Sequence, residues 1–104
     1  MEGLELISFE IISNVGMSKS LSIEAIREAR KGNYENADEK LKISSQYLTN
    51  GHHAHTSLIQ QEAAGDKVDF SLILMHAEDQ MMSAEIIRSL AEEMIEMYKD
   101  LKKA

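Results

Sequence analysis

Hydrophobic residues recur at steps of three and four along most of the chain, the spacing of one face of an α-helix. The first such stripe runs through Leu4, Ile7, Ile11 and Val15. The pattern is interrupted at Lys31-Gly32-Asn33 and at Ala64-Gly65-Asp66, where a glycine precedes a residue type that favours helix N-caps. These two joints predict three helices, over roughly 4–31, 34–64 and 67–102.

The fold class that follows is all-α, an antiparallel up-down-up bundle of three helices. The chain has no proline and only five glycines, which leaves few residues for the many turns of a sheet protein. Each predicted helix has about 30 residues and would be about 45 Å long. Neither joint is long enough for a domain linker, so we expect one domain over residues 1–104.

The predicted third helix carries a histidine and an aspartate on its apolar face. With about 100° between successive residues, His76 falls near the middle of that face and Asp79 lies on it as well. The apolar residues of this face are Leu72, Ile86, Ile87, Leu90, Met94, Met97 and Leu101. Glu78 and Glu85 fall on the opposite, polar face. A carboxylate in an apolar seam, together with surplus apolar groups, suggests self-association.

Charge and composition exclude several classes of function. The net charge of −7 disfavours nucleic acid and anionic membranes as partners, because both require clustered lysine and arginine. No run of about 18 apolar residues could span a membrane. The absence of cysteine rules out disulfides and thiolate metal sites. With an acidic N-terminal stretch in place of a signal peptide, these features are compatible with an intracellular protein.

Two residues of the third segment are candidates for chemistry. An imidazole titrates near pH 6.5, at about neutral pH, so His76 could act as a nucleophile that accepts a phosphoryl group. The alternative is a hydrogen-bonded core histidine. Asp79 could orient His76, or copies of Asp79 could share a cation such as Mg²⁺ on a symmetry axis. The alternative is an exposed carboxylate, or one bonded to Ser83.

A histidine cluster in the second segment is a weaker signal. His52 and His55 are three residues apart and share a helix face, as metal ligands could, but a solvated polar patch explains them better. The sequence contains no phosphate loop, dinucleotide fingerprint or hydrolase triad order. The methionines of the third segment are expected to fill the core: Met75, Met81, Met82, Met94 and Met97.

The stretch LILMHAEDQMM over residues 72–82 resembles the signature of the lactose/cellobiose (N,N′-diacetylchitobiose)-type IIA family of the bacterial sugar phosphotransferase system. That signature is an apolar run, then His-Ala-Gln-Asp-His and two apolar residues. Other parts of the chain are similar to the same family in order: residues 11–16, 18–25, 31–34, 51–56 and 58–59. The resemblance covers nearly the whole chain.

The resemblance implies a phosphocarrier that assembles as a nine-helix homotrimer. His76 would accept a phosphoryl group from the carrier HPr and pass it to the cysteine of a IIB component, which serves a IIC permease. Asp79 would bind a structural divalent metal, Mg²⁺ or a similar ion, on the threefold axis. The resemblance leaves open whether chitobiose, cellobiose, lactose or another sugar is transported.

This sequence departs from the family pattern at two positions. Glu78 replaces the usual glutamine, and its predicted place on the polar face suggests that the change matters little. Gln80 replaces a second histidine; it could still hydrogen-bond, but it cannot carry a proton. His53 and His55 are candidates to help bind the phosphoryl group. We expect His76 half-buried at a subunit interface, with its reactive nitrogen accessible.

Two other functions remain as alternatives. The first is a non-catalytic helical adaptor or regulator that keeps the fold and oligomerises without carrying phosphate. The second is a metal-binding helical bundle built on His52, His55 and Asp79.

Overall fold

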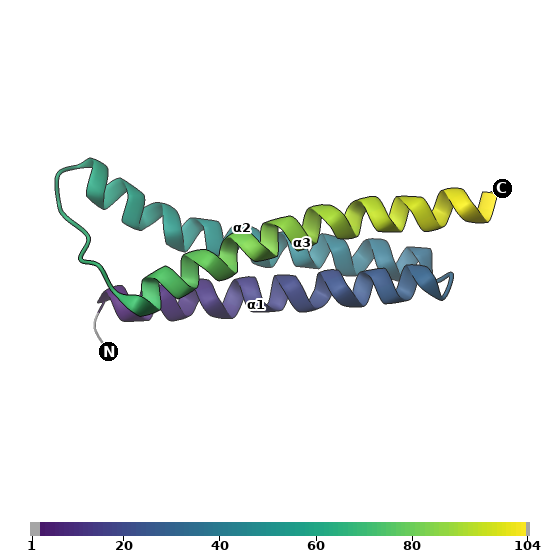
Figure 1. Ribbon diagram of the computed structural model, residues 1–104, viewed down its shortest axis with the longest axis horizontal. Coiled ribbons are helices and arrows are strands. Elements are labelled where there is room, and N and C mark those ends of the chain that lie inside the picture. The colour runs from purple at the N-terminus through teal and green to yellow at the C-terminus, as the bar shows by residue number, and fades with distance from the viewer. Residues whose placement is uncertain (1–2, 104) are drawn as a thin grey trace.

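A computed structural model describes residues 3–103, which form three long helices joined by two turns (Figure 1). These are α1 (Gly3–Arg30), α2 (Tyr34–Ala63) and α3 (Leu72–Lys103). α1 and α3 run in the same direction and α2 runs in the opposite one (Figure 1). The described residues contain no strand, so the prediction of an all-α, up-down-up three-helix bundle is confirmed.

The first joint is a tight turn closed by backbone hydrogen bonds. Gly32 has a φ of 88°, a left-handed conformation that glycine adopts without steric cost, and the Asn33 N–H donates to the Glu28 carbonyl at 2.9 Å. Asn33 occupies the N-cap position of α2, but its side chain makes no capping bond. Its amide nitrogen donates instead to Glu28 Oε2 at 2.8 Å. This bond to the ionised carboxylate lowers the pKa of Glu28.

The second joint is longer than predicted, because α3 begins at Leu72 and not near residue 67. Gly65 has a φ of 90°, and the Asp66 N–H donates back to the Gln61 carbonyl at 3.1 Å. Asp66 therefore closes the end of α2 and does not start the next helix. The start of α3 is capped by Ser71, whose Oγ accepts a hydrogen bond from the Leu74 N–H at 3.0 Å.

The core between the helices is built from small residues in two clusters. One joins all three helices near the Gly32 turn: Ala25, Ala29, Ala37, Leu41, Ala91 and Ile95. The other lies nearer the opposite end and joins α1 to α3: Ile11, Val15, Ala77, Met81 and Ala84. Alanines at the contact allow the helix axes to approach closely.

A layer of buried serine hydroxyls lies between α1 and α2. Ser18, Ser22 and Ser44 are fully buried. The Ser44 hydroxyl donates to the Ser18 carbonyl at 2.7 Å, and its single proton is then used. The hydroxyls of Ser18 and Ser22, at 2.9 and 2.8 Å from Ser44 Oγ, must therefore donate to it. Both lone pairs of Ser44 Oγ are filled, so the layer is internally satisfied.

The apolar face of α3 points away from the other two helices. Its exposed members include Leu72, Met82, Ile86, Leu90, Met97 and Leu101, with exposures between 51% and 72%. We call this set, with Met75 and Met94, the outward stripe. Of the five methionines expected in the core, only Met81 is buried, because the inward face of α3 is filled mainly by alanines.

The length and hydropathy of the helices determine whether one of them could span a membrane. No helix within residues 3–103 combines enough length with enough hydropathy to cross a bilayer.

Candidate functional site

His76 lies in the second turn of α3 and is exposed in the protomer. The residue that follows it, Ala77, is fully buried against α1, so the helix holds the imidazole at the border between the outward stripe and α1. The backbone of this turn is fixed by packing while the ring remains open to solvent. An exposed imidazole on a rigid helix is available to a partner without any rearrangement of the core.

Asp79 is also exposed, and it lies within the outward stripe. Leu72 and Ile86, seven residues before and after it, are 72% and 60% exposed, so all three share one side of α3. Asp79 thus supplies hard carboxylate oxygens, of the type that Mg²⁺ prefers, in the centre of an apolar surface. One chain supplies too few ligands for a site, because residues 3–103 contain no cluster of three candidate metal ligands.

Gln80 contacts a lysine of α1 that no sequence motif singled out. The Lys19 Nζ on α1 donates to Gln80 Oε1 at 2.9 Å, and both side chains are half-buried. Gln80 follows His76 by four residues, about one helical turn. The Cβ atoms of two residues at this spacing are about 5–6 Å apart. The contact places a positive charge on the α1 flank of His76.

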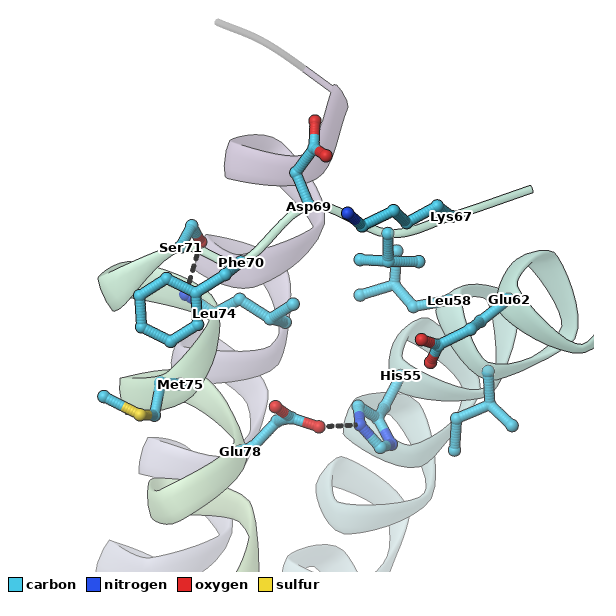
Figure 2. A pocket seen from close by; sticks show the side chains of 12 residues that line it. His55, Leu58, Glu62, Lys67, Asp69, Phe70, Ser71, Leu74, Met75 and Glu78 are labelled. Atoms are coloured by element: carbon cyan, nitrogen blue, oxygen red, sulfur yellow. Dashed lines mark hydrogen bonds and ion pairs between the residues drawn. The ribbon is translucent and has the colours of Figure 1, made fainter. Parts of the chain in front are cut away.

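A groove opens between α2 and the start of α3 on another side of the molecule (Figure 2). Glu78 points across it to His55, and the His55 Nε2 and Glu78 Oε2 atoms are 2.7 Å apart. Apolar side chains form much of the wall, among them Leu58, Leu74 and the 80% exposed Phe70. Glu78, predicted to lie on the polar face of α3, therefore joins α3 to α2 through His55.

Several charged residues of α3 contact α2. A second pair joins His52 to Glu85, and the Arg88 Nε donates to Ser45 Oγ at 2.9 Å. Near the Gly32 turn, Lys99 donates to both oxygens of Asp38 at 2.9 Å. These bonds raise the pKa of Lys99. Polar contacts therefore join α2 to α3 in addition to the apolar cluster of Ala91 and Ile95, on a face that a helical wheel indicated as solvated.

The other predicted histidines are not brought to His76 within the protomer. His53 is exposed and lines a shallow depression with Glu10 and Asn14 of α1. His55 is held in the groove by Glu78. A role for either beside His76 would require a neighbouring copy. His52, His55 and Asp79 do not form a common cluster in residues 3–103 either, so a single chain does not build the alternative metal site.

The arrangement supports nucleophilic chemistry at one imidazole with little other machinery. His76 offers a ring nitrogen, Lys19 a nearby positive charge, and Asp79 a metal-type oxygen donor one turn away. Phosphoryl transfer demands positioning and charge stabilisation more than covalent help from the protein. The site fits that demand better than it fits hydrolysis, which would need an activated water or a triad.

Comparison with known proteins identifies the family. Residues 6–99 match the family model described as the PTS system, lactose/cellobiose specific IIA subunit. The chain is 39% identical over 100 residues to the lichenan-specific phosphotransferase enzyme IIA component of Bacillus subtilis, which covers 96% of this chain and 91% of the relative. It is 35% identical over 98 residues to the lactose-specific EIIA component of Streptococcus mutans, with 94% of each chain covered.

Solved structures agree with this assignment. The cellobiose-specific enzyme IIA from Bacillus anthracis superposes with a TM-score of 0.96 and 38% identity, covering 99% of this chain and 94% of that one. The IIA(Chitobiose) chain, solved in complex with HPr, gives a TM-score of 0.86 and 31% identity, covering 98% and 99%. With His76 and Asp79 of the His-Ala-x-Asp segment exposed on α3, these matches establish that the chain belongs to the lactose/cellobiose-specific IIA family of the sugar phosphotransferase system.

Proposed function

We propose that this protein is a phosphocarrier that accepts a phosphoryl group on His76 and donates it during sugar uptake. The observation that carries the proposal is the exposure of His76 on a rigid turn of α3, in the His-Ala-x-Asp segment of a IIA family member. A carrier must reach two different partners with one side chain. A sealed imidazole could not do so, whereas His76 is open in the protomer.

The chemistry is a displacement at phosphorus between two imidazoles. A ring nitrogen of neutral His76 attacks the phosphorus, and the bond between the phosphorus and the donor's histidine nitrogen breaks. One proton leaves the His76 ring and one returns to the donor ring, so no net proton is consumed. In the second transfer a thiolate attacks the same phosphorus and the His76 nitrogen is the leaving group. Neither step requires an oxidant or a metal.

The proposed donor is HPr and the proposed acceptor is the cysteine of a IIB component, which serves a IIC permease. Support for HPr comes from a relative of this chain that was solved as an IIA(Chitobiose)–HPr complex. This role would place the protein in the cytoplasm, beside the permease. Chitobiose, cellobiose and lactose are all compatible with it, since the carrier does not touch the sugar.

The proposed assembly is a homotrimer in which the outward stripes of three chains face one another. The stripe is a continuous exposed apolar surface along a helix of 32 residues, more than a protomer of this size leaves bare without a reason. Three Asp79 carboxylates would then meet and share a divalent cation, with Mg²⁺ the best match to oxygen ligands. A cation bound there would offset the carboxylate charge and hold the copies together.

The test is transfer of labelled phosphate from phosphoenolpyruvate through enzyme I and HPr onto the wild type, His76→Ala and His52→Ala. We expect acid-labile label on the wild type and on His52→Ala, whose exposed histidine serves as the matched control. We expect none on His76→Ala. Label that persists on His76→Ala would move the site to another histidine, and an unlabelled, folded wild type would favour the adaptor function.

A further inference from the structure

We propose that Lys19, held in place by Gln80, is a catalytic residue that binds the phosphoryl group carried on His76. The inference rests on the proposed function and assigns a second residue to the same site. Its starting point is the 2.9 Å hydrogen bond from Lys19 Nζ on α1 to Gln80 Oε1 on α3.

Lys19 has a different kind of partner from two other lysines that bridge helices, Lys40 and Lys99. Lys40 joins α2 to the Glu24 carboxylate of α1, and Lys99 joins α3 to the Asp38 carboxylate of α2. Each of those charges is neutralised by its partner. Lys19 instead donates to a neutral amide, which orients the ammonium group without cancelling its charge. A positioned cation with a neutral partner can still attract an anion.

The helix register places this cation beside His76. α1 and α3 run in the same direction (Figure 1), and the Lys19–Gln80 bond joins residues that are 61 apart in the chain. The same offset sets His76 level with Val15. The second core cluster supports this register, because Val15 packs there with Ala77. Lys19 is therefore about one helical turn, roughly 6 Å along the axis, from the level of His76.

The angular positions of Gln80 and His76 around the α3 axis agree with this register. Gln80 follows His76 by four residues, which is about 40° around the helix axis. Since Gln80 faces α1, His76 borders that flank too. On α1, a Cβ added at Gly16 would meet nothing within 4 Å, so the chain leaves room beside its own backbone there. Glycine at this position adds no side chain that could fill the space beside the α1 backbone.

Electrostatics explain why a cation is needed at this point. A side-chain phosphoryl group carries about two negative charges near neutral pH, and the whole chain carries −7. Asp79 lies one turn from His76 and would repel the group wherever no cation offsets its charge. A cation aimed at the charge that develops during transfer is the usual way for a protein to stabilise it. Gln80 acts as the positioning residue, and its NH₂ group is a further donor.

The experiment compares Lys19→Met, Lys19→Arg and Gln80→Ala with the wild type and with Lys40→Met, a control that removes another bridging lysine. Each protein is phosphorylated with HPr and, separately, with phosphoramidate, which releases ammonia as it transfers its phosphoryl group to an imidazole. Phosphorus NMR follows the resonance that is missing in His76→Ala. Circular dichroism and gel filtration confirm that each variant folds and assembles as the wild type does.

We expect Lys19→Met to accept phosphate about 10-fold more slowly or worse and to raise the pKa of the bound phosphoryl group, because a nearby cation favours the dianion. Lys19→Arg should restore both properties most of the way, and Gln80→Ala should fall between. Removing a lysine with only a structural role would not change the pKa of the bound phosphoryl group. If Lys19→Met matches the wild type in rate and titration while the wild type is labelled normally, the inference is wrong.

Failure of the proposed function gives a different result. In that case HPr labels neither the wild type nor any variant at His76. The phosphoramidate arm still decides the inference, because it forms phosphohistidine without a protein partner. An unchanged phosphoryl titration in Lys19→Met would then overturn it on its own.

Discussion

Replacing Gly51 with alanine tests how tightly α2 packs against α1. The added Cβ would lie 2.7 Å from Val15 Cγ1, whereas carbon atoms in contact normally lie about 3.5–4.0 Å apart. Val15 cannot give way easily, because it is fully buried and a β-branched side chain in a helix has one strongly preferred rotamer. Overpacking of this kind costs about 1–3 kcal/mol. The higher helix propensity of alanine returns about 0.5–1 kcal/mol.

The expected net effect of Gly51→Ala is a loss of about 1 kcal/mol in the free energy of unfolding. For a chain of this length, each such loss lowers the Tm by about 4–8 °C. Urea unfolding followed by far-UV circular dichroism measures it, at one fixed protein concentration because assembly couples stability to concentration. Gly16→Ala is the matched control: its Cβ would meet nothing within 4 Å, so its stability should stay level or rise.

A second variant isolates the steric cause. Val15→Ala alone leaves a cavity and should cost roughly 1–3 kcal/mol. Combined with Gly51→Ala it also removes the clashing methyl group, so the double variant should be less destabilised than the sum of the two single variants. Strict additivity, or a Gly51→Ala protein as stable as the wild type, would refute this account of the contact.

Three further predictions follow, two from the described contacts and one, for Asp79, from the proposed trimer. Ser44→Ala leaves two buried hydroxyls without their acceptor and should cost about 1–3 kcal/mol in urea unfolding. Lys99→Met should cost at most about 1 kcal/mol near pH 7. Because the Asp38 bond raises the pKa of Lys99 above 10.5, the difference from wild type should vanish as pH rises through that raised pKa. Asp79→Asn should abolish stoichiometric divalent-cation binding, measured by calorimetry.

Local chemistry made the number of helices and the first joint predictable. Gly32 requires a left-handed conformation, and a glycine after a basic last turn is a strong local stop signal. The start of α3 was harder, because both Asp66 and Ser71 are capping residue types. Only the structure shows that the Asp66 N–H is used by the end of α2 and that Ser71 caps α3.

Which face of α3 meets its neighbours could not be read from periodicity alone. A helical wheel separates charged from apolar residues, but it does not say which side another helix will cover. Here α2 covers the charged side, through pairs such as His55–Glu78 that join residues 23 apart. The apolar side stays outward. Small residues such as Ala77 and Ala84 fill the inward face, and their weak hydropathy gives little signal.

The sequence drew attention to His76 and Asp79 through a short motif, but not to Lys19. The contact between Lys19 and Gln80 spans 61 residues, and no local pattern predicts such a pairing. One signal was available. Lys19 lies on the same flank of the first helix as Ile12 and Ile23, at heptad-like steps, and a lysine among apolar positions indicates a specific partner or a snorkelling side chain.

His76 and Asp79 lie at different places relative to the outward stripe, so the stripe can form a contact between copies while His76 stays accessible. The two residues are three apart, which is about 60° around α3. Asp79 lies near the centre of the outward stripe, between Leu72 and Ile86, while His76 lies at its border with α1. If copies of the chain cover the stripe as proposed, Asp79 is buried within the contact between them and His76 lies at the edge of that contact. One helix can thus supply both the assembly contact and a nucleophile that partners can reach, provided that the neighbouring copy approaches from the Asp79 side.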